Sequence, residues 1–183
     1  MAKKQKALVV LAQIDVQIAF LLRCRSVFPR LGGDLVGQRT FEAPEYYRQH
    51  GHDVVVTLPE PMTAGFISDL NNLAHWLNEN FVLRLFAVLE SNGLFRARIR
   101  NELDGHDEMD MTRRLRNMIG HGGLYDPDDA DKRKLYDRIV QHFQVNSQSY
   151  LDDPMVYPLG VGQVLVPLAE GCKRYVTAAS NAQ

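Results

Sequence analysis

Residues 64–90, AGFISDLNNLAHWLNENFVLRLFAVLE, carry the clearest structural pattern of the chain. Large apolar residues recur there every three or four positions, at Phe66, Leu70, Leu73, Leu77, Phe81, Leu85 and Val88. That spacing places them on one face of an α-helix of roughly six turns or more. Thr63 can cap the first turn, and Gly93 follows the last. The stretch therefore predicts one long helix with a single buried face.

Four shorter segments on either side show the same kind of pattern. They cover residues 5–25, about 108–119, a segment that begins at Asp126-Pro127, and about 162–179. Asp126 suits the cap of its helix and Pro127 the first helical position. We expect Pro167 to lie in a first turn, because proline disrupts a helix interior.

The segment between the first two predicted helices, residues 26–63, breaks the helical pattern. Its beginning, FPRLGGDLVGQ, is rich in turn-forming residues, and Val54–Thr57 is a short β-branched run that can form a strand. Such a length is unusual for a connection in a compact helical domain. The segment therefore indicates a functional loop or an inserted element.

Together these patterns predict an all-α fold, a helical bundle of about five helices with a loop or short-strand insertion near residues 26–63. The chain of 183 residues is long enough for one domain with a real core. No linker is evident, so we expect a single domain over 1–183.

The composition is that of a soluble globular protein, with 45% hydrophobic and 23% charged residues. The net charge of −1 gives no global attraction to nucleic acid or membrane. Cys24 and Cys172 are too few for a disulfide framework or a zinc cluster, which favours a reducing cytoplasm. The apolar run after the basic start MAKKQK contains Gln13, Asp15 and Gln17. We therefore expect neither a signal peptide nor the roughly 20 apolar residues of a membrane span.

Residues 113–123, RRLRNMIGHGG, carry the chemistry that stands out from this ordinary background. Arg116 and His121 are five residues apart, which separates them by about 140° on a continuous helix. Gly120 allows the helix to end or unwind so that His121 can turn back. Arginine binds phosphate oxygens through two prongs, and histidine titrates near neutral pH. Together they meet the needs of phosphodiester cleavage.

A purely structural explanation of this stretch stays open. A histidine at a helix C-terminus is favoured by the helix dipole, and glycine is the usual residue after a helix. The arginines Arg113, Arg114 and Arg116 can then be a solvated helix face.

The motif RNMIGHG resembles the signature of HEPN-domain proteins: an arginine, often followed by a polar residue such as Asn, four to six further positions, and a histidine. Arg116-Asn117 and His121 match this signature with a spacer of four. Arg114 also falls within the allowed spacing but lacks the polar successor. In the family the motif lies at a helix end late in a helical bundle, and residues 64–146 fit that arrangement.

The resemblance implies metal-independent cleavage of RNA by attack of the ribose 2′-hydroxyl, with no cofactor. Two chains pair as a homodimer so that two motifs face one cleft. His121 would assist the attack or protonate the leaving oxygen, Arg116 would hold the scissile phosphate, and Asn117 would orient either group. The setting would be a stress, toxin or defence system with a cognate inhibitor or antitoxin protein. Some HEPN domains instead bind nucleotides or scaffold assemblies, so a non-catalytic module is the alternative.

One departure from the family concerns the residues after His121. The toxin branch that works with a nucleotidyltransferase antitoxin has tyrosine two residues after the histidine. Gly123 stands at that position, and the first tyrosine is Tyr125. The sequence therefore does not favour that particular partner.

A third hypothesis is a small metal-dependent enzyme that uses His50 and His52. Both lie beside Asp53, but no third ligand stands nearby at a known spacing. We rank this hypothesis last.

Overall fold

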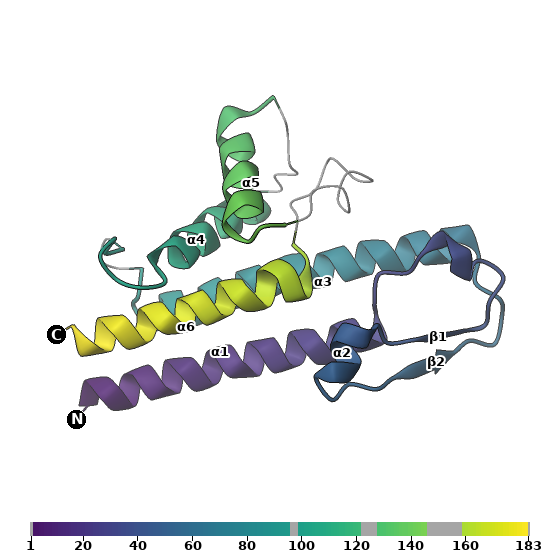
Figure 1. Ribbon diagram of the computed structural model, residues 1–183, viewed down its shortest axis with the longest axis horizontal. Helices are drawn as coiled ribbons and strands as arrows, with labels where there is room; N and C mark the ends of the chain where they lie inside the picture. Colours follow the sequence, from purple (N-terminus) through teal and green to yellow (C-terminus); the bar gives the residue numbers. More distant parts are fainter. Residues whose placement is uncertain (1, 96–98, 122–127, 146–158, 183) are drawn as a thin grey trace. The chain divides into compact units, whose positions relative to one another are not determined.

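The structure, a computed structural model, describes residues 2–95, 99–121, 128–145 and 159–182. Helices make up most of this part of the chain (Figure 1). The longer ones are α1 (Ala2–Val27), α3 (Ala64–Ser91), α4 (His106–Gly120), α5 (Ala130–His142) and α6 (Val166–Asn181). The short elements are the 3₁₀ turn η1 (Gly33–Leu35), strand β1 (Thr40–Glu42), helix α2 (Glu45–Gln49), strand β2 (Val55–Thr57) and the π turn η3 (Val161–Leu165). The fold is thus all-α with a small insertion, as the sequence predicts.

The chain divides into two compact units. Residues 1–17 and 81–183 form the first, called the bundle unit below, and residues 18–80 form the second, the hairpin unit. The boundaries fall inside α1 and α3, so no separate linker segment joins the units.

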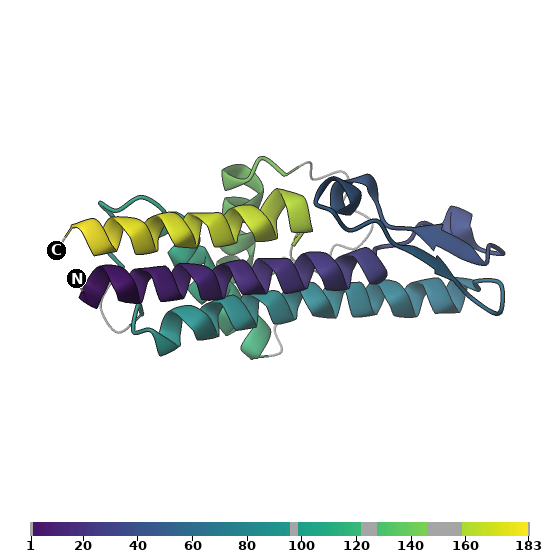
Figure 2. The ribbon, with the colours of Figure 1, turned by 90° about the horizontal axis from the view of Figure 1, so that it is seen from below.

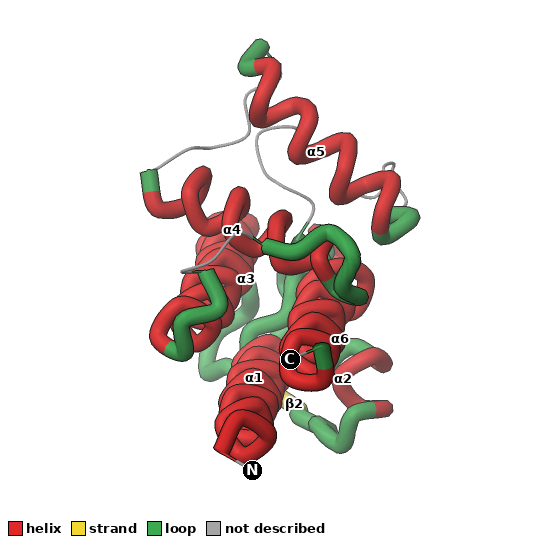
Figure 3. The backbone as a smooth tube through the Cα atoms, turned by 90° about the vertical axis from the view of Figure 1, so that its left-hand side faces the viewer, coloured by secondary structure: helices red, strands yellow, loops and turns green. Residues whose placement is uncertain are grey.

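The bundle unit is built around side chains that are almost inaccessible to water. They are Ile14, Val82, Leu85, Leu89, Met109, Met111, Leu115, Leu135, Ile139, Val164, Leu165 and Leu168. Burial of each such side chain contributes roughly 1.5–3 kcal/mol. Figure 3 looks along α6 and shows α5 running across it, which agrees with Figure 1. Helix α4 packs against both α5 and α6, so α4 is the central element of this unit.

Helix α4 begins in a way that the sequence did not predict. Its N-cap is Gly105, with a left-handed φ of 81°, and Asp107 and Glu108 lie in the first turn. A Cβ atom at this position would lie 2.0 Å from the carbonyl oxygen of Gly171 in α6. Glycine is therefore required twice, by the backbone conformation and by the close approach of α6.

The other helix ends agree better with expectation. Asp129 caps α5, since its Oδ1 accepts hydrogen bonds from the backbone N–H groups of Asp131 (3.0 Å) and Lys132 (3.2 Å). Asp126 and Pro127, predicted to begin this helix, lie outside the described residues. Pro167 lies in the first turn of α6, as predicted.

The hairpin unit contains a two-stranded antiparallel sheet, in which Phe41 of β1 pairs with Val56 of β2. Figure 2 shows α2 in the connection at one end of this ladder. Leu31, Phe41, Met62 and Ile67 form the buried cluster of the unit. The short-strand insertion predicted near residues 26–63 is therefore confirmed, and it has a core of its own.

The face that α3 buries differs in its first half from the predicted stripe. Phe66 is 36% exposed, whereas Ile67 and Ala74 are buried. The reason lies in the preceding segment, which packs Leu31 and Met62 against Ile67. This contact could not be read from helical periodicity alone.

Helix α1 is both long and apolar. Over Lys4–Val27 it is long and apolar enough to cross a membrane by length and composition, with a mean hydropathy of 1.8, and 22% of that window is buried. The expectation that no stretch reaches this length was therefore wrong. One such helix is weak support for a membrane protein, since a mostly buried core helix of a soluble protein and a signal sequence near an N-terminus meet the same criteria. Asp15, within this helix, pairs with Lys173 of α6 at 2.7 Å.

Candidate functional site

The motif residues lie at the C-terminal end of α4. Arg116 and Asn117 belong to the last turns, and His121 is the residue that caps the helix. The helix ends at Gly120, as expected, but His121 does not turn back toward Arg116. Its backbone N–H still donates to the carbonyl oxygen of Asn117 at 3.2 Å, which continues the helical pattern for one residue.

Arg116 is held from two sides. Its Nη1 donates a hydrogen bond to Asn117 Oδ1 at 3.1 Å. Its guanidinium carbon lies 4.9 Å from the centre of the Phe86 ring of α3, a cation–π contact. Phe86 is 6% exposed and stacks on Phe95 with 4.7 Å between ring centres. The side chain of Arg116 is therefore positioned before any ligand arrives.

Asn117 and His121 occupy a different face of α4 from Arg116. They are four residues apart, one above the other, and both are exposed. Arg116 is about 100° from Asn117 and about 140° from His121 around the helix. In a single chain, Asn117 and His121 therefore share one face of α4. Arg116 lies on a different face, from which its side chain reaches Asn117.

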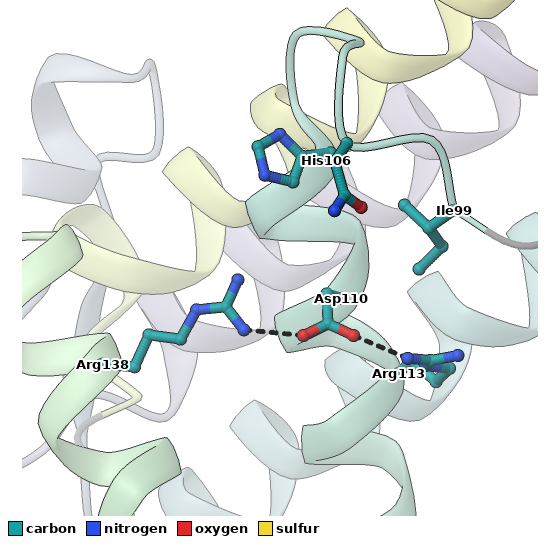
Figure 4. A pocket seen from close by; sticks show the side chains of 6 residues that line it. Ile99, His106, Asp110, Arg113 and Arg138 are labelled. Atoms are coloured by element: carbon teal, nitrogen blue, oxygen red, sulfur yellow. Dashed lines mark hydrogen bonds and ion pairs between the residues drawn. The ribbon is translucent and has the colours of Figure 1, made fainter.

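Arg113 and Arg114 are ion-paired and do not simply form a solvated face. Asp110, one turn before them, accepts hydrogen bonds from Arg113 Nη2 at 2.7 Å and from Arg114 Nε at 2.9 Å. Arg138 of α5 donates to the same carboxylate at 2.6 Å and also bonds to Asp107 (Figure 4). These bonds tie α5 to α4.

The pKa of Asp110 reflects this environment. Partial burial acts to raise it, but the hydrogen bonds and charges of the three arginines outweigh burial and hold the pKa below the usual value for an aspartate. Asp110 is therefore a carboxylate at neutral pH and fixes the guanidinium groups around it.

A pocket of about 260 Å³ opens beside this carboxylate. Ile99, Asn101, His106, Asp110, Arg113 and Arg138 line it (Figure 4). Sequence reasoning missed this pocket. The spacing of Asp110, Arg113 and Arg114 is visible in the sequence as pairs three and four residues apart. Arg138 gives no such signal, because it comes 28 residues after Asp110.

A second charged cluster lies inside the bundle unit and is structural. Glu108 is 5% exposed, yet it receives a hydrogen bond from Arg174 Nη2 at 2.6 Å and lies 3.3 Å from His142 Nε2. A buried carboxylate needs such partners to offset its lost hydration. The cluster joins α4, α5 and α6 at one point.

The loop histidines belong to the hairpin unit. His50 caps α2, and its Nδ1 lies 2.7 Å from the carbonyl oxygen of Tyr46. Among the residues that the structure describes, no group of three or more His, Cys, Asp or Glu residues is placed to hold a metal ion. Gly123 and Tyr125, which bear on the choice of antitoxin, lie outside the described residues.

Comparisons with models of protein families, with curated proteins and with solved structures found no match to this chain. A functional assignment therefore rests on the chain's own residues, above all on the end of α4. There the positioned Arg116–Asn117 pair and the exposed His121 lie within one and a half turns of each other.

Proposed function

We propose that the protein is a metal-independent endoribonuclease that cleaves RNA by attack of the 2′-hydroxyl. Arg116, Asn117 and His121 carry the reaction, and no cofactor takes part. The observation that supports this most strongly is the pre-positioned Arg116, bonded to Asn117 and held over Phe86, five residues before an exposed histidine.

The proposed reaction needs only these groups and the substrate. The 2′-oxygen forms a bond to phosphorus, and the bond from phosphorus to the 5′-oxygen breaks. The 2′-hydroxyl loses its proton and the 5′-oxygen gains one, with His121 in one of these two transfers. Arg116 stabilises the negative charge on the phosphate oxygens through its two-pronged guanidinium. The products are a 2′,3′-cyclic phosphate and a 5′-hydroxyl.

The helix geometry supports a homodimer as the active form. Within one chain Arg116 and His121 are about 140° apart around α4, which is poor for joint action on one phosphate. A second copy related by two-fold symmetry supplies its own His121 to the Arg116 of the first, and the reverse. We propose that the two ends of α4 meet across this interface.

The proposed setting is the cytoplasm, within a stress, toxin or defence system. RNA is the substrate, and a cognate inhibitor or antitoxin protein restrains the enzyme. An enzyme without a metal requirement is active wherever RNA is present, which makes a protein inhibitor a natural means of control.

The deciding experiment incubates the purified protein with RNA in EDTA. We expect cleavage products that end in 2′,3′-cyclic phosphate, and cleavage about 10²- to 10⁴-fold slower by His121→Ala. Loss of cleavage in EDTA with recovery on addition of a divalent ion would overturn the metal-independent mechanism.

The alternative is a non-catalytic nucleotide-binding or protein-interaction module. If the chain acts as a monomer, the position of Arg116 and His121 on different faces of α4 favours this non-catalytic module, because the two groups cannot easily act on one phosphate. A well-folded protein that binds RNA or nucleotides but cleaves no RNA would identify this alternative as correct.

A further inference from the structure

We propose that the pocket beside Asp110 is a second phosphate subsite of the same RNA site, which binds a backbone phosphate of single-stranded RNA a few nucleotides from the cleaved linkage. This proposal rests on the proposed function for its substrate class. It assigns a role to Arg113, Arg138 and His106, which lie outside the catalytic motif.

The charge of the pocket favours an anion. Among the described residues its lining includes Arg113, Arg138 and His106 and one acidic residue, Asp110. Asp107 is adjacent to His106 in the chain, pairs with Arg138 and lies 3.6 Å from His106 Nε2, so Arg113 is the donor least engaged by carboxylates. Arg113 donates to Asp110 through a single terminal nitrogen, and its side chain is 48% exposed. The other N–H groups of this guanidinium are therefore accessible to a ligand. A charged donor of this kind forms short, strong hydrogen bonds with phosphate oxygens.

Asp110 has the role of an organiser in this arrangement. Its two carboxylate oxygens hold Arg138 on one side and Arg113 on the other, as Figure 4 shows. Side chains fixed in this way lose little conformational entropy when a ligand binds. The carboxylate thus lowers the cost of binding while the arginines supply the attraction.

The size of the pocket limits what it can hold. Its volume of about 260 Å³ is below the roughly 300–1,000 Å³ of sites that enclose whole small molecules. It suits a phosphate with part of a ribose better than a complete nucleotide. Ile99 gives the pocket one apolar wall, against which the sugar carbons can pack.

The position of the pocket connects it to the proposed reaction. His106, Asp110, Arg113, Asn117 and His121 follow one another at intervals of three or four residues, so they share one face of α4. Arg113 and His121 are eight residues apart, about 12 Å along the helix axis. Stacked nucleotides advance about 3.4 Å each, so this length spans at most three or four nucleotides. One strand along this face reaches both sites.

The test measures binding without cleavage. The probe is a fluorescent single-stranded RNA in which every 2′-hydroxyl is methylated, so that no attack can occur. Affinity is determined over a series of salt concentrations for the wild type, Arg113→Gln and Arg113→Lys. Arg133→Gln is the matched control, because it removes one positive charge from an exposed site on α5. Thermal melts verify that each variant is folded.

We expect Arg113→Gln to weaken binding about fivefold and to reduce the slope of log affinity against log salt by about 0.7, the value for one phosphate contact on a single strand. Arg113→Lys should restore the slope, since it retains the charge. Arg133→Gln should leave the slope unchanged. An unchanged slope in folded Arg113→Gln, or no RNA binding by the wild type, would overturn the proposal.

Further measurements distinguish a failure of the proposed subsite from a failure of the proposed nuclease. An unmethylated strand of the same sequence that binds with the expected slope but is never cleaved refutes the nuclease and leaves the subsite standing. Cleavage with the same KM and slope in Arg113→Gln refutes the subsite and leaves the nuclease standing. Binding of inorganic phosphate that is lost in Arg113→Gln, while the RNA affinity and salt slope of that variant stay unchanged, would assign the pocket to a free anion and overturn its role with RNA.

Discussion

Gly171 lies so close to the side chain of Glu108 that a Cβ atom at position 171 would be 2.2 Å from Glu108 Cγ and 2.6 Å from its Cβ. The glutamate cannot move aside freely, because Arg174 and His142 hold its carboxylate. The absence of a side chain in α6 thus determines how closely α4, which carries the proposed site, can pack.

Gly171→Ala should destabilise the protein by about 1–3 kcal/mol, the usual cost of an overpacked core. Chemical denaturation measures this loss. Gly65→Ala is the matched control, since the nearest atom to its Cβ would be Thr63 Oγ1 at 3.8 Å. Alanine within a helix is generally favoured over glycine by about 0.5–1 kcal/mol, so Gly65→Ala should not destabilise. Equal stability of Gly171→Ala and the wild type would show that the helices can separate without cost.

His121→Ala should reduce RNA cleavage by about 10²- to 10⁴-fold, the usual contribution of a general acid or base. Arg116→Ala should lose a comparable amount, and Arg116→Lys should recover only part of it, because a point charge replaces a two-pronged group. Initial rates on a defined RNA measure both effects.

Stability separates catalytic from structural roles for the same variants. His121 is exposed, so its substitution should leave the thermal midpoint nearly unchanged. Arg116→Ala should lower the free energy of unfolding by about 0.5–1 kcal/mol, because the cation–π contact with Phe86 is lost. A large drop in the thermal midpoint of both variants would identify Arg116 and His121 as structural residues. Wild-type cleavage rates in both folded variants would refute the nuclease.

Mixing the two inactive variants tests the proposed dimer. In a dimer of Arg116→Ala with His121→Ala, one of the two shared sites has both groups intact. Half of the randomly formed dimers are mixed, so the mixture should recover about a quarter of wild-type activity. Light scattering should find a dimer at micromolar concentration. No recovery in a mixture that exchanges subunits would place Arg116 and His121 of one chain in the same site.

Asp110→Asn should lower stability at pH 7 by about 1–2 kcal/mol, because three arginines lose a charged partner. The pKa of Asp110 is lowered in the folded state, so its stabilisation is present above the unfolded pKa and is lost as the pH falls through the folded value. The difference between wild type and variant should therefore be constant near neutrality and shrink below about pH 4. Asp137→Asn, at an exposed site on α5, should change stability by less than about 0.5 kcal/mol at any pH. A difference that grows in acid would contradict this assignment.

Cys172 should resist thiol reagents for as long as the protein is folded. Burial raises its pKa to about 12, although the Thr112 hydroxyl at 3.4 Å partly opposes the shift. The thiolate is the reactive form, so native Cys172 has almost none to offer. Intact mass after maleimide treatment should show one adduct, on the partly exposed Cys24, and two adducts in denaturant. Equal labelling of both cysteines in the native state would contradict the burial of Cys172.

The parts of the fold that sequence predicted are those set by local chemistry. Helical spacing located the long helices, and the missing N–H of Pro167 fixed its place in a first turn. Asn117 and His121 fall one turn apart for the same local reason. Their role in RNA cleavage stays a prediction.

The parts that sequence missed depend on contacts between distant segments. Gly105 begins α4 because α6 approaches it, and the buried face of α3 shifts toward Ile67 because the inserted segment packs there. Arg138 joins Asp110 only after α5 folds back across α4. Periodicity describes one helix at a time and carries no information about which neighbour will cover it.

The close contact between α4 and α6 also sets an order of events during synthesis. Gly171 leaves the ribosome 51 residues after Gly120, which at about 5–20 residues per second is a delay of roughly three to ten seconds. Until then the helix with the proposed catalytic groups lacks the surface on which it packs.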